Sequence, residues 1–192
     1  MKASVKRLQS GLLLFIVNMG LVFSGQIWAQ TATIDFERAT LVSKFAKYVS
    51  WPNEARQSDF IIGVYEDVEK YEYFKGFFTN KGVKNKDISV RLLTSLTEAK
   101  DVNILYMSSP KQRDLSKFME RVIDGSPVLV ISEDTKDLSK TMVDISYDPE
   151  NAKISVKVID ANIVDGELIM PELSNLLANN SDGEVLSLSP TF

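Results

Sequence analysis

Two pairs of neighbouring carboxylates have the residue types and the spacing that could support chemistry. Glu66 with Asp67, and Glu133 with Asp134, each follow closely after a short apolar run of the sequence. If the two runs are parallel strands of one sheet, both pairs lie at its carboxyl edge, where open α/β folds bind ligands. Carboxylate oxygens suit Ca²⁺ or Mg²⁺, and two opposed carboxylates can hydrolyse a glycosidic bond. These four residues therefore form the candidate ligand edge of the chain.

The surrounding sequence gives little support to a metal site or to catalysis at this edge. Acidic residues that follow a strand commonly cap the next helix, and the spacing here matches no calcium-binding loop. No aromatic platform for a sugar can be assigned to the same edge, and no glycine-rich phosphate loop joins a strand to a helix. Ser139 and Lys140 are neighbours in a polar loop and need not meet, so a Ser-Lys hydrolase has little support. We expect no metal and no cofactor.

The sequence contains no His and no Cys. It therefore lacks the usual general base near neutral pH, the Ser-His-Asp triad and most kinds of zinc site. It also lacks a thiolate nucleophile and any disulfide. These absences favour a binding protein that is not an enzyme. A hydrolase built on carboxylates is the open alternative.

The chain is acidic, with 26 Asp and Glu against 22 Lys and Arg and a formal net charge of −4. Without its first 29 residues it keeps 163 residues with 19 basic and 26 acidic side chains, a net charge of −7. An acidic protein whose sequence shows no basic cluster is a poor ligand for nucleic acid or for an anionic membrane. We therefore expect a protein or small-molecule partner and no nucleic acid.

Residues 1–29 have the order of a secretory signal peptide. Basic residues precede an apolar run from Gly11 to Phe23, and the small Ala29 stands at the expected cleavage position. The apolar run is shorter than the about 20 residues that a transmembrane helix needs. We expect an exported protein whose signal peptide is removed, and an uncleaved N-terminal anchor is the alternative.

The rest of the sequence alternates between apolar runs and amphipathic segments. Apolar residues at helical spacing predict a helix over 34–49, which ends before Pro52 because helix is disfavoured in front of proline. Short apolar or alternating runs predict strands, and the segments between them predict helices. The expected strands are 59–65, 88–93, 102–107 and 127–131, and the expected helices are 68–79, a short turn after Ser95, and Ser109 to Gly125.

This order of elements defines the expected fold. Strands that alternate with helices favour an α/β protein with a mostly parallel sheet flanked by helices, a Rossmann-like three-layer arrangement. Alternating residues at 142–147 and 153–158 predict a C-terminal antiparallel hairpin at a sheet edge. A short helix from Pro171 follows, so we expect a single domain over 30–179 and a polar, mobile tail over 180–192.

Aromatic residues are the candidates for contact with a partner, because Trp and Tyr dominate the energetics of interfaces. Tyr48, Trp51 and Pro52 form a corner at the end of the first expected helix. The expected helix at 68–79 adds Tyr73 and Phe78, because it is rich in aromatic residues and has more aromatic surface than one packed face needs. Packing in the core is the competing role for both groups.

Four stretches of the sequence stand out: the aromatic-Trp-Pro corner at 45–52, the strand at 60–65, the segment 99–109 and the Gly-X-Pro-Val-Leu strand at 125–133. Together they resemble the YfiR family of small periplasmic bacterial proteins. The paired glycines that are usual after the fourth strand of that family are replaced by Lys140-Thr141, and an asparagine by Asp160. The cysteines of some relatives are absent, which argues against a redox-sensing role.

The resemblance implies a non-enzymatic α/β protein of the periplasm that regulates signalling. The best-known role in the family is repression of a membrane diguanylate cyclase through its periplasmic sensor domain, which lowers cyclic-di-GMP and biofilm formation. Other relatives occur with histidine kinases, so a small-molecule sensor that acts with such a kinase is the alternative. Release of the partner would follow a bound ligand or a change of oligomeric state, such as a homo-oligomer.

Overall fold

The computed structural model describes residues 32–51, 59–109, 127–159, 168 and 184–188. The chain divides into two compact units, Met1–Phe36 and Glu37–Phe192. In the first unit, the described residues 32–36 are helical. In the second unit, residues 37–48 are helical.

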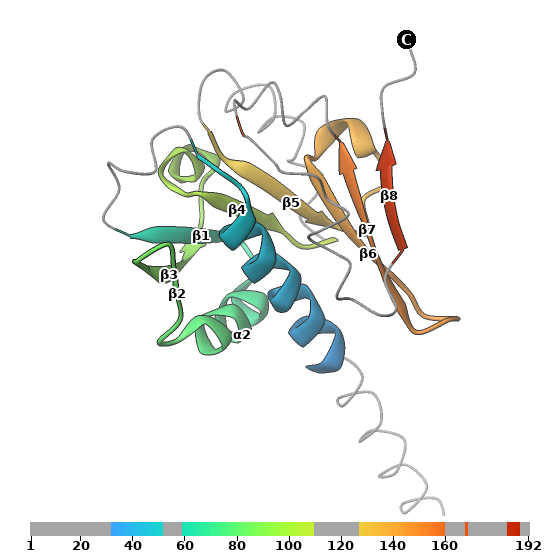
Figure 1. The fold of residues 1–192 in the computed structure, drawn as a ribbon, viewed down its shortest axis with the longest axis horizontal. Coiled ribbons are helices and arrows are strands. Elements are labelled where there is room, and N and C mark those ends of the chain that lie inside the picture. The colour runs from blue at the N-terminus through green and yellow to red at the C-terminus, as the bar shows by residue number, and fades with distance from the viewer. Residues whose placement is uncertain (1–31, 52–58, 110–126, 160–167, 169–183, 189–192) are drawn as a thin grey trace, which may run out of the picture. The chain divides into compact units, whose positions relative to one another are not determined.

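The second unit is built on one mixed sheet of eight described strands in the order β2-β3-β1-β4-β5-β6-β7-β8 (Figure 1). The five strands β3, β1, β4, β5 and β6 run parallel to their neighbours, whereas β2 with β3 and β6 with β7 form antiparallel pairs. The strands are β1 Phe60–Tyr65, β2 Gly82–Val83, β3 Lys86–Leu93, β4 Ile104–Met107, β5 Leu129–Glu133, β6 Val143–Asp148, β7 Lys153–Ile159 and β8 Glu184–Leu188.

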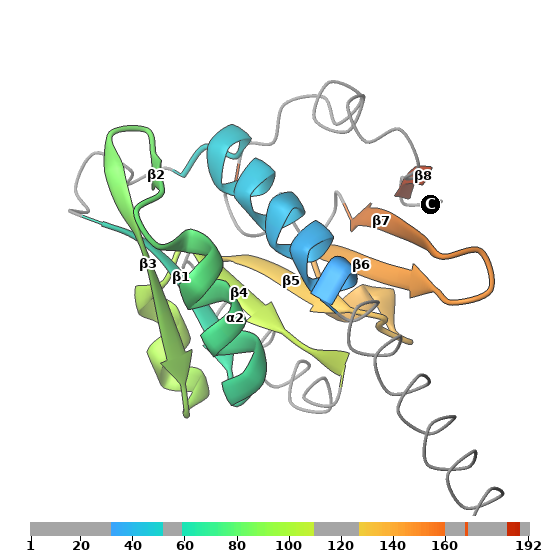
Figure 2. The same ribbon diagram turned by 90° about the horizontal axis from the view of Figure 1, so that it is seen from below.

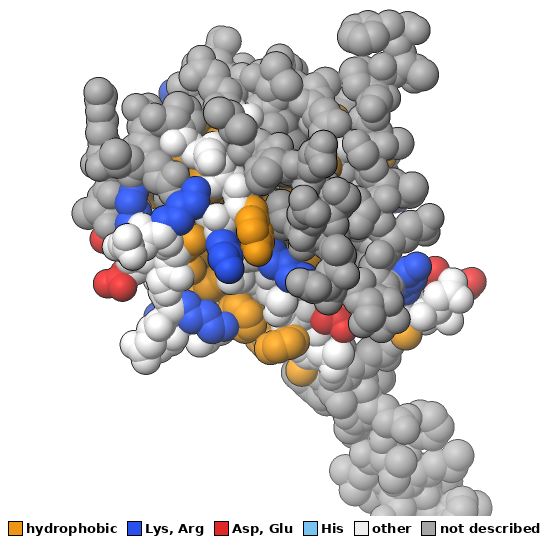
Figure 3. Space-filling view, viewed as in Figure 1, with side chains coloured by type: hydrophobic (Ala, Val, Ile, Leu, Met, Phe, Trp, Pro, Cys, Tyr) orange, Lys and Arg blue, Asp and Glu red, His pale blue; other side chains and the backbone are white. Residues whose placement is uncertain are grey.

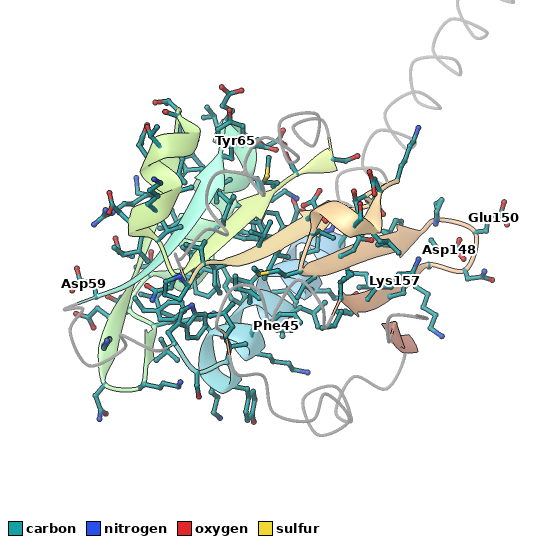
Figure 4. The ribbon with its side chains drawn as sticks, turned by 90° about the horizontal axis from the view of Figure 1, so that it is seen from above. Phe45, Asp59, Tyr65, Asp148, Glu150 and Lys157 are labelled. Carbon is teal, nitrogen blue, oxygen red and sulfur yellow. The ribbon has the colours of Figure 1, made fainter. Side chains whose placement is uncertain are left out.

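Two helices lie on the same face of this sheet, the helix ending at residue 48 and α2 Val68–Phe78 (Figure 2). The first helix turns Phe45 toward the sheet (Figure 4), and this side chain is fully buried. Phe74 of α2 packs edge-on against Tyr106 of β4, with 4.7 Å between the ring centroids. Strands β4 and β5 are buried along their whole length, so the core lies around the centre of the sheet.

Side-chain caps explain where the short helices begin. Asp67 is the N-cap of α2, and its carboxylate accepts a hydrogen bond from the Lys70 amide at 3.0 Å. Ser95 caps the 3₁₀ helix η2 Leu96–Asp101 in the same way, through the amide of Thr97. Asp137 caps the 3₁₀ helix η4 Leu138–Lys140. The sequence pattern therefore places the helix starts correctly at Asp67 and Ser95.

The opposite face of the sheet requires a glycine in the middle of β1. A Cβ atom on Gly63 would lie 2.5 Å from Leu93 Cδ1 and 3.0 Å from Val102 Cγ1. These two apolar side chains therefore close over the strand only because residue 63 has no side chain. Figure 4 shows Asp59 and Tyr65 at the two ends of this strand region.

The expected α/β class, the mostly parallel sheet and the antiparallel hairpin β6–β7 are confirmed. The expectation that the hairpin lies at the sheet edge is wrong, because β8 pairs in parallel with β7. The segment 180–192, expected to be a polar, mobile tail, therefore contains a strand. Its five residues show too weak an alternation of polar and apolar side chains to predict that strand from the sequence. The expected helices after Ser109 and from Pro171, and the signal peptide, lie outside the described residues.

Candidate functional site

Glu133 is at the carboxyl end of β5 and is only 5% exposed. Its Oε1 atom lies 3.0 Å from Lys70 Nζ of α2 and accepts a hydrogen bond of 2.6 Å from the hydroxyl of Tyr106. Lys70 and Tyr106 are themselves buried. A buried carboxylate requires such partners, because moving a charge out of water without compensation costs roughly several kcal/mol.

Arg38 of the first helix completes the charge balance. Its guanidinium lies 3.5 Å from Glu133 Oε2 and 3.0 Å from Asp134 Oδ2. Two cations thus face two carboxylates, and we name these five residues the edge cluster: Arg38, Lys70, Tyr106, Glu133 and Asp134. The cluster ties both helices to the end of β5, so its geometry serves to position elements of the fold.

The turn after β5 holds the second carboxylate of the pair in place. Asp134 has a positive φ of 50°, and its Oδ1 accepts a 2.8 Å hydrogen bond from the amide of Tyr147. Its own amide donates to the carbonyl of Ile145 at 3.3 Å. Both carboxylate oxygens of Asp134 are therefore engaged within the protein, one by Arg38 and one by the backbone of β6.

The structure separates the four residues of the candidate ligand edge. Glu133 and Asp134 belong to the edge cluster, whereas Asp67 is the N-cap of α2. Glu66 is exposed, has a φ of 47°, and donates its amide to the carbonyl of Leu93. In the described part of the chain, no three Asp or Glu side chains are grouped in a way that could hold a metal ion.

A second polar cluster, which the sequence analysis did not find, lies on the opposite face of the sheet. Asp144 of β6 is 1% exposed and accepts hydrogen bonds from the Ser132 hydroxyl at 3.0 Å and the Thr135 amide at 2.9 Å. Ser132 and Thr141 also share a hydrogen bond of 3.0 Å. Because these side chains are buried, Ser132 is a structural hydroxyl rather than an accessible nucleophile. The sequence offers one signal for this cluster, because Ser132 and Asp144 are polar residues inside the apolar runs of β5 and β6.

Trp51 lies in the core although it was a candidate for partner contact. It is 5% exposed, its indole N–H donates to the carbonyl of Asn103 at 3.2 Å, and its ring packs edge-on against Phe60. Asn103 also pairs with Ile61, since its side-chain oxygen accepts the Ile61 amide at 2.8 Å. The indole therefore joins the end of the first helix to the start of β1 and β4.

The other aromatic candidates differ in exposure. Phe78 is 1% exposed and packs against Phe74 and Phe77, so it does not point away from the core. Tyr73 is half-buried, and Pro52 lies outside the described residues. Tyr48 is 43% exposed at the end of the first helix. Among the described members of the predicted partner-contact group, the accessible ones are therefore Tyr48 and, in part, Tyr73.

One lysine lies beside this exposed tyrosine, and two more lie over rings near the end of α2 and at Trp51. Lys47 Nζ lies 5.3 Å from the centroid of the Tyr48 ring, and Lys81 Nζ lies 3.2 Å from that of Phe77. Lys84 donates to the carbonyl of Val49 at 2.8 Å and lies 5.7 Å from the Trp51 ring. Loss of hydration lowers the pKa of Lys81 from its ordinary value. We name Lys47, Tyr48, Lys81 and Lys84 the basic–aromatic face.

The sequence could have revealed part of both groups. Arg38 and Lys70 are charged residues at helical positions that otherwise face the core, which is a signal for a buried ion pair. The basic–aromatic face unites two segments that are far apart in the sequence, 47–51 and 81–84. Each segment alone has too few charges to stand out in an acidic chain.

The fold is that of an α/β protein with a mostly parallel sheet. At the carboxyl end of β5, the carboxylates of Glu133 and Asp134 are paired with cations of the protein itself. The YfiR/HmsC-like family model matches residues 37–163. The chain therefore belongs to the YfiR/HmsC-like family, which indicates a periplasmic regulator of signalling that interacts with a membrane signalling protein. No curated protein is significantly similar to the chain. Among the described helices, none combines the length and the apolar character needed to cross a bilayer.

Proposed function

We propose that this protein is a non-enzymatic periplasmic regulator that binds the periplasmic sensor part of a membrane signalling protein. The partner is a diguanylate cyclase, which the bound protein represses, so that cyclic-di-GMP and biofilm formation fall. Family membership over residues 37–163 is the observation that carries this proposal. A regulator of this kind needs only different affinities for two states of its partner, worth about 1–3 kcal/mol of coupling.

The internal pairing of the carboxylates supports a binding role over catalysis. Glu133 is neutralised by Arg38 and Lys70, and Asp67 is used as a helix cap. A glycosidase needs one protonated and one ionised carboxyl group that both reach the substrate. Carboxylates that are already engaged within the fold are poorly suited to that task.

The experiment compares cells that lack the gene with cells that express the protein again. We expect cyclic-di-GMP and biofilm to rise on deletion and to return on expression of the exported protein. Crosslinking in intact cells, followed by mass spectrometry, should recover a membrane protein with a periplasmic sensor and a cyclase domain. If cyclic-di-GMP stayed unchanged and crosslinking recovered a histidine kinase, the partner would be that kinase and not a cyclase.

A further inference from the structure

The end of the first helix and the β2–β3 hairpin concentrate positive charge in an otherwise acidic chain. Segments 44–51 and 80–87 together contain five lysines and one acidic residue, whereas the whole chain has a net charge of −4. The bond from Lys84 Nζ to the carbonyl of Val49, 2.8 Å, brings the two segments together in space. The basic–aromatic face is therefore a local reversal of the overall charge.

Part of this charge has a structural explanation and part does not. Lys84 serves the fold, because it donates to a carbonyl at the end of the first helix and lies over the Trp51 ring. Lys47 and Lys81 contact aromatic rings, and within the described residues no ion pair joins either of them to a carboxylate. Their charges remain available to an incoming group.

Tyr48 supplies the apolar component of the same surface. It is one of three large hydrophobic residues that are exposed in the described structure, and Lys47 lies beside its ring. Figure 3 shows Lys and Arg side chains beside hydrophobic ones on the face that carries the two helices, and acidic side chains both near the middle of the view and toward its left and right sides. A surface that combines an exposed tyrosine with lysines is suited to contact with an anionic ligand.

We infer that the basic–aromatic face binds an acidic segment of the partner protein, with Tyr48 against an apolar side chain of that segment. This inference rests on the proposed function and names the surface and the chemistry of its partner. An anionic membrane would also attract lysines, but it would face the acidic remainder of the protein as well. A short segment senses mainly charges within a Debye length, about 8 Å at physiological salt, and so responds to the local lysines.

The test reverses two charges on the face and two elsewhere. The face variant is Lys47→Glu with Lys81→Glu, and the matched control is Lys100→Glu with Lys136→Glu, which changes the net charge equally at two exposed positions. Circular dichroism and urea unfolding establish that both variants fold. Binding of the full exported chain is measured by fluorescence anisotropy with a labelled peptide rich in Asp and Glu and containing one Leu, and repression is measured as cellular cyclic-di-GMP.

We expect the face variant to bind the acidic peptide about tenfold or more weakly and to lose repression, while the control keeps both. Added salt should weaken peptide binding by the wild-type protein more than by the face variant. Equal peptide binding and equal repression by the two variants would overturn the inference and leave the proposed function intact. Wild-type protein that never represses would refute the proposed function, whereas the peptide assay would still decide the inference.

Vesicles of phosphatidylglycerol distinguish the membrane from a protein segment. The inference predicts no binding of the wild-type protein to these vesicles at physiological salt. Vesicle binding that the face variant loses, together with unchanged binding of the acidic peptide, would overturn the assignment to a protein partner. The neutral variant Lys47→Gln with Lys81→Gln should show an intermediate affinity for the peptide, because it removes attraction without adding repulsion.

Discussion

The first helix contributes to two groups of charged residues, the edge cluster and the basic–aromatic face, which use similar side chains in opposite ways. At Arg38, the helix contributes to the edge cluster, where both cations are buried and face carboxylates. Nine positions further along the helix, the cation of Lys47 faces solvent beside an exposed tyrosine. The difference shows that pairing and burial, and not the type of residue, decide whether a charge holds the fold or is available to a partner.

The two groups also have different energetic consequences. A buried ion pair contributes little net stability, but removal of one partner leaves an uncompensated charge and is costly. Exposed charges contribute about 1 kcal/mol or less each, so their replacement leaves the fold intact. Variants should therefore separate into those that unfold the protein and those that change only binding.

Replacement of Trp51 by Ala should have the largest effect on the free energy of unfolding, a loss of about 4 kcal/mol. The substitution removes a buried ring from the junction of the first helix with Phe60 and Asn103 and leaves a cavity. Trp51→Phe should cost about 1 kcal/mol, the value of the lost hydrogen bond. Urea unfolding measures both, and a fully stable Trp51→Ala protein would show that the indole does not join these elements.

Replacement of Glu133 by Gln should lower the free energy of unfolding by about 3 kcal/mol, because the buried Lys70 and Arg38 both lose the charge of Glu133, although Arg38 keeps its ion pair with Asp134. The sharper comparison is the triple variant Arg38→Met, Lys70→Met and Glu133→Leu. It removes all three charges and should therefore unfold at a clearly higher urea concentration than Glu133→Gln. It should stay below the wild-type value only because the buried Tyr106 hydroxyl loses its acceptor. A triple variant as unstable as Glu133→Gln would contradict the account of the edge cluster.

Replacement of Asp67 by Ala should cost about 1 kcal/mol, because the amide of Lys70 loses its cap. Asp67→Asn keeps an oxygen acceptor and should be close to wild-type stability. The pair distinguishes a cap from an anionic ligand site at this edge. If Asp67→Asn abolished repression while the protein stayed folded, the carboxylate would have a role that the cap does not explain.

Replacement of Tyr48 by Ala should change stability least, by about 0.5 kcal/mol or less, since the side chain is exposed. Repression and affinity for the acidic peptide should fall all the same. Lys136→Ala, at an exposed position after β5, is the control for a surface change of no functional consequence. Normal repression by Tyr48→Ala would remove the tyrosine from the contact surface.

The sequence predicts the local elements well because their signals are local. The proline at 52, the cap at Asp67 and the alternation in the hairpin each depend on neighbouring residues. The sequence does not predict strand β8, because this strand is stabilised by parallel pairing with β7, whose residues lie far away in the sequence. The hairpin turn with Asp148 and Glu150, by contrast, is seen at its expected place, while Lys157 lies along β7 (Figure 4).

The candidate site is harder to predict because it depends on which distant residues meet. The sequence gives the acidic pair Glu133 and Asp134 but not the cations that neutralise it, since Arg38 and Lys70 come from two helices. It also suggests Trp51 for the surface, although the indole finds a buried carbonyl at Asn103. Only the packed fold shows that a charge is paired or a ring is covered.

The most direct test of the central claim is the level of cyclic-di-GMP in cells that express the triple apolar variant of the edge cluster. The claim is that this protein acts by binding through an exposed surface and that its buried carboxylates serve the fold. The account predicts wild-type repression by the folded variant Arg38→Met, Lys70→Met and Glu133→Leu. A folded, exported triple variant that no longer represses would contradict it.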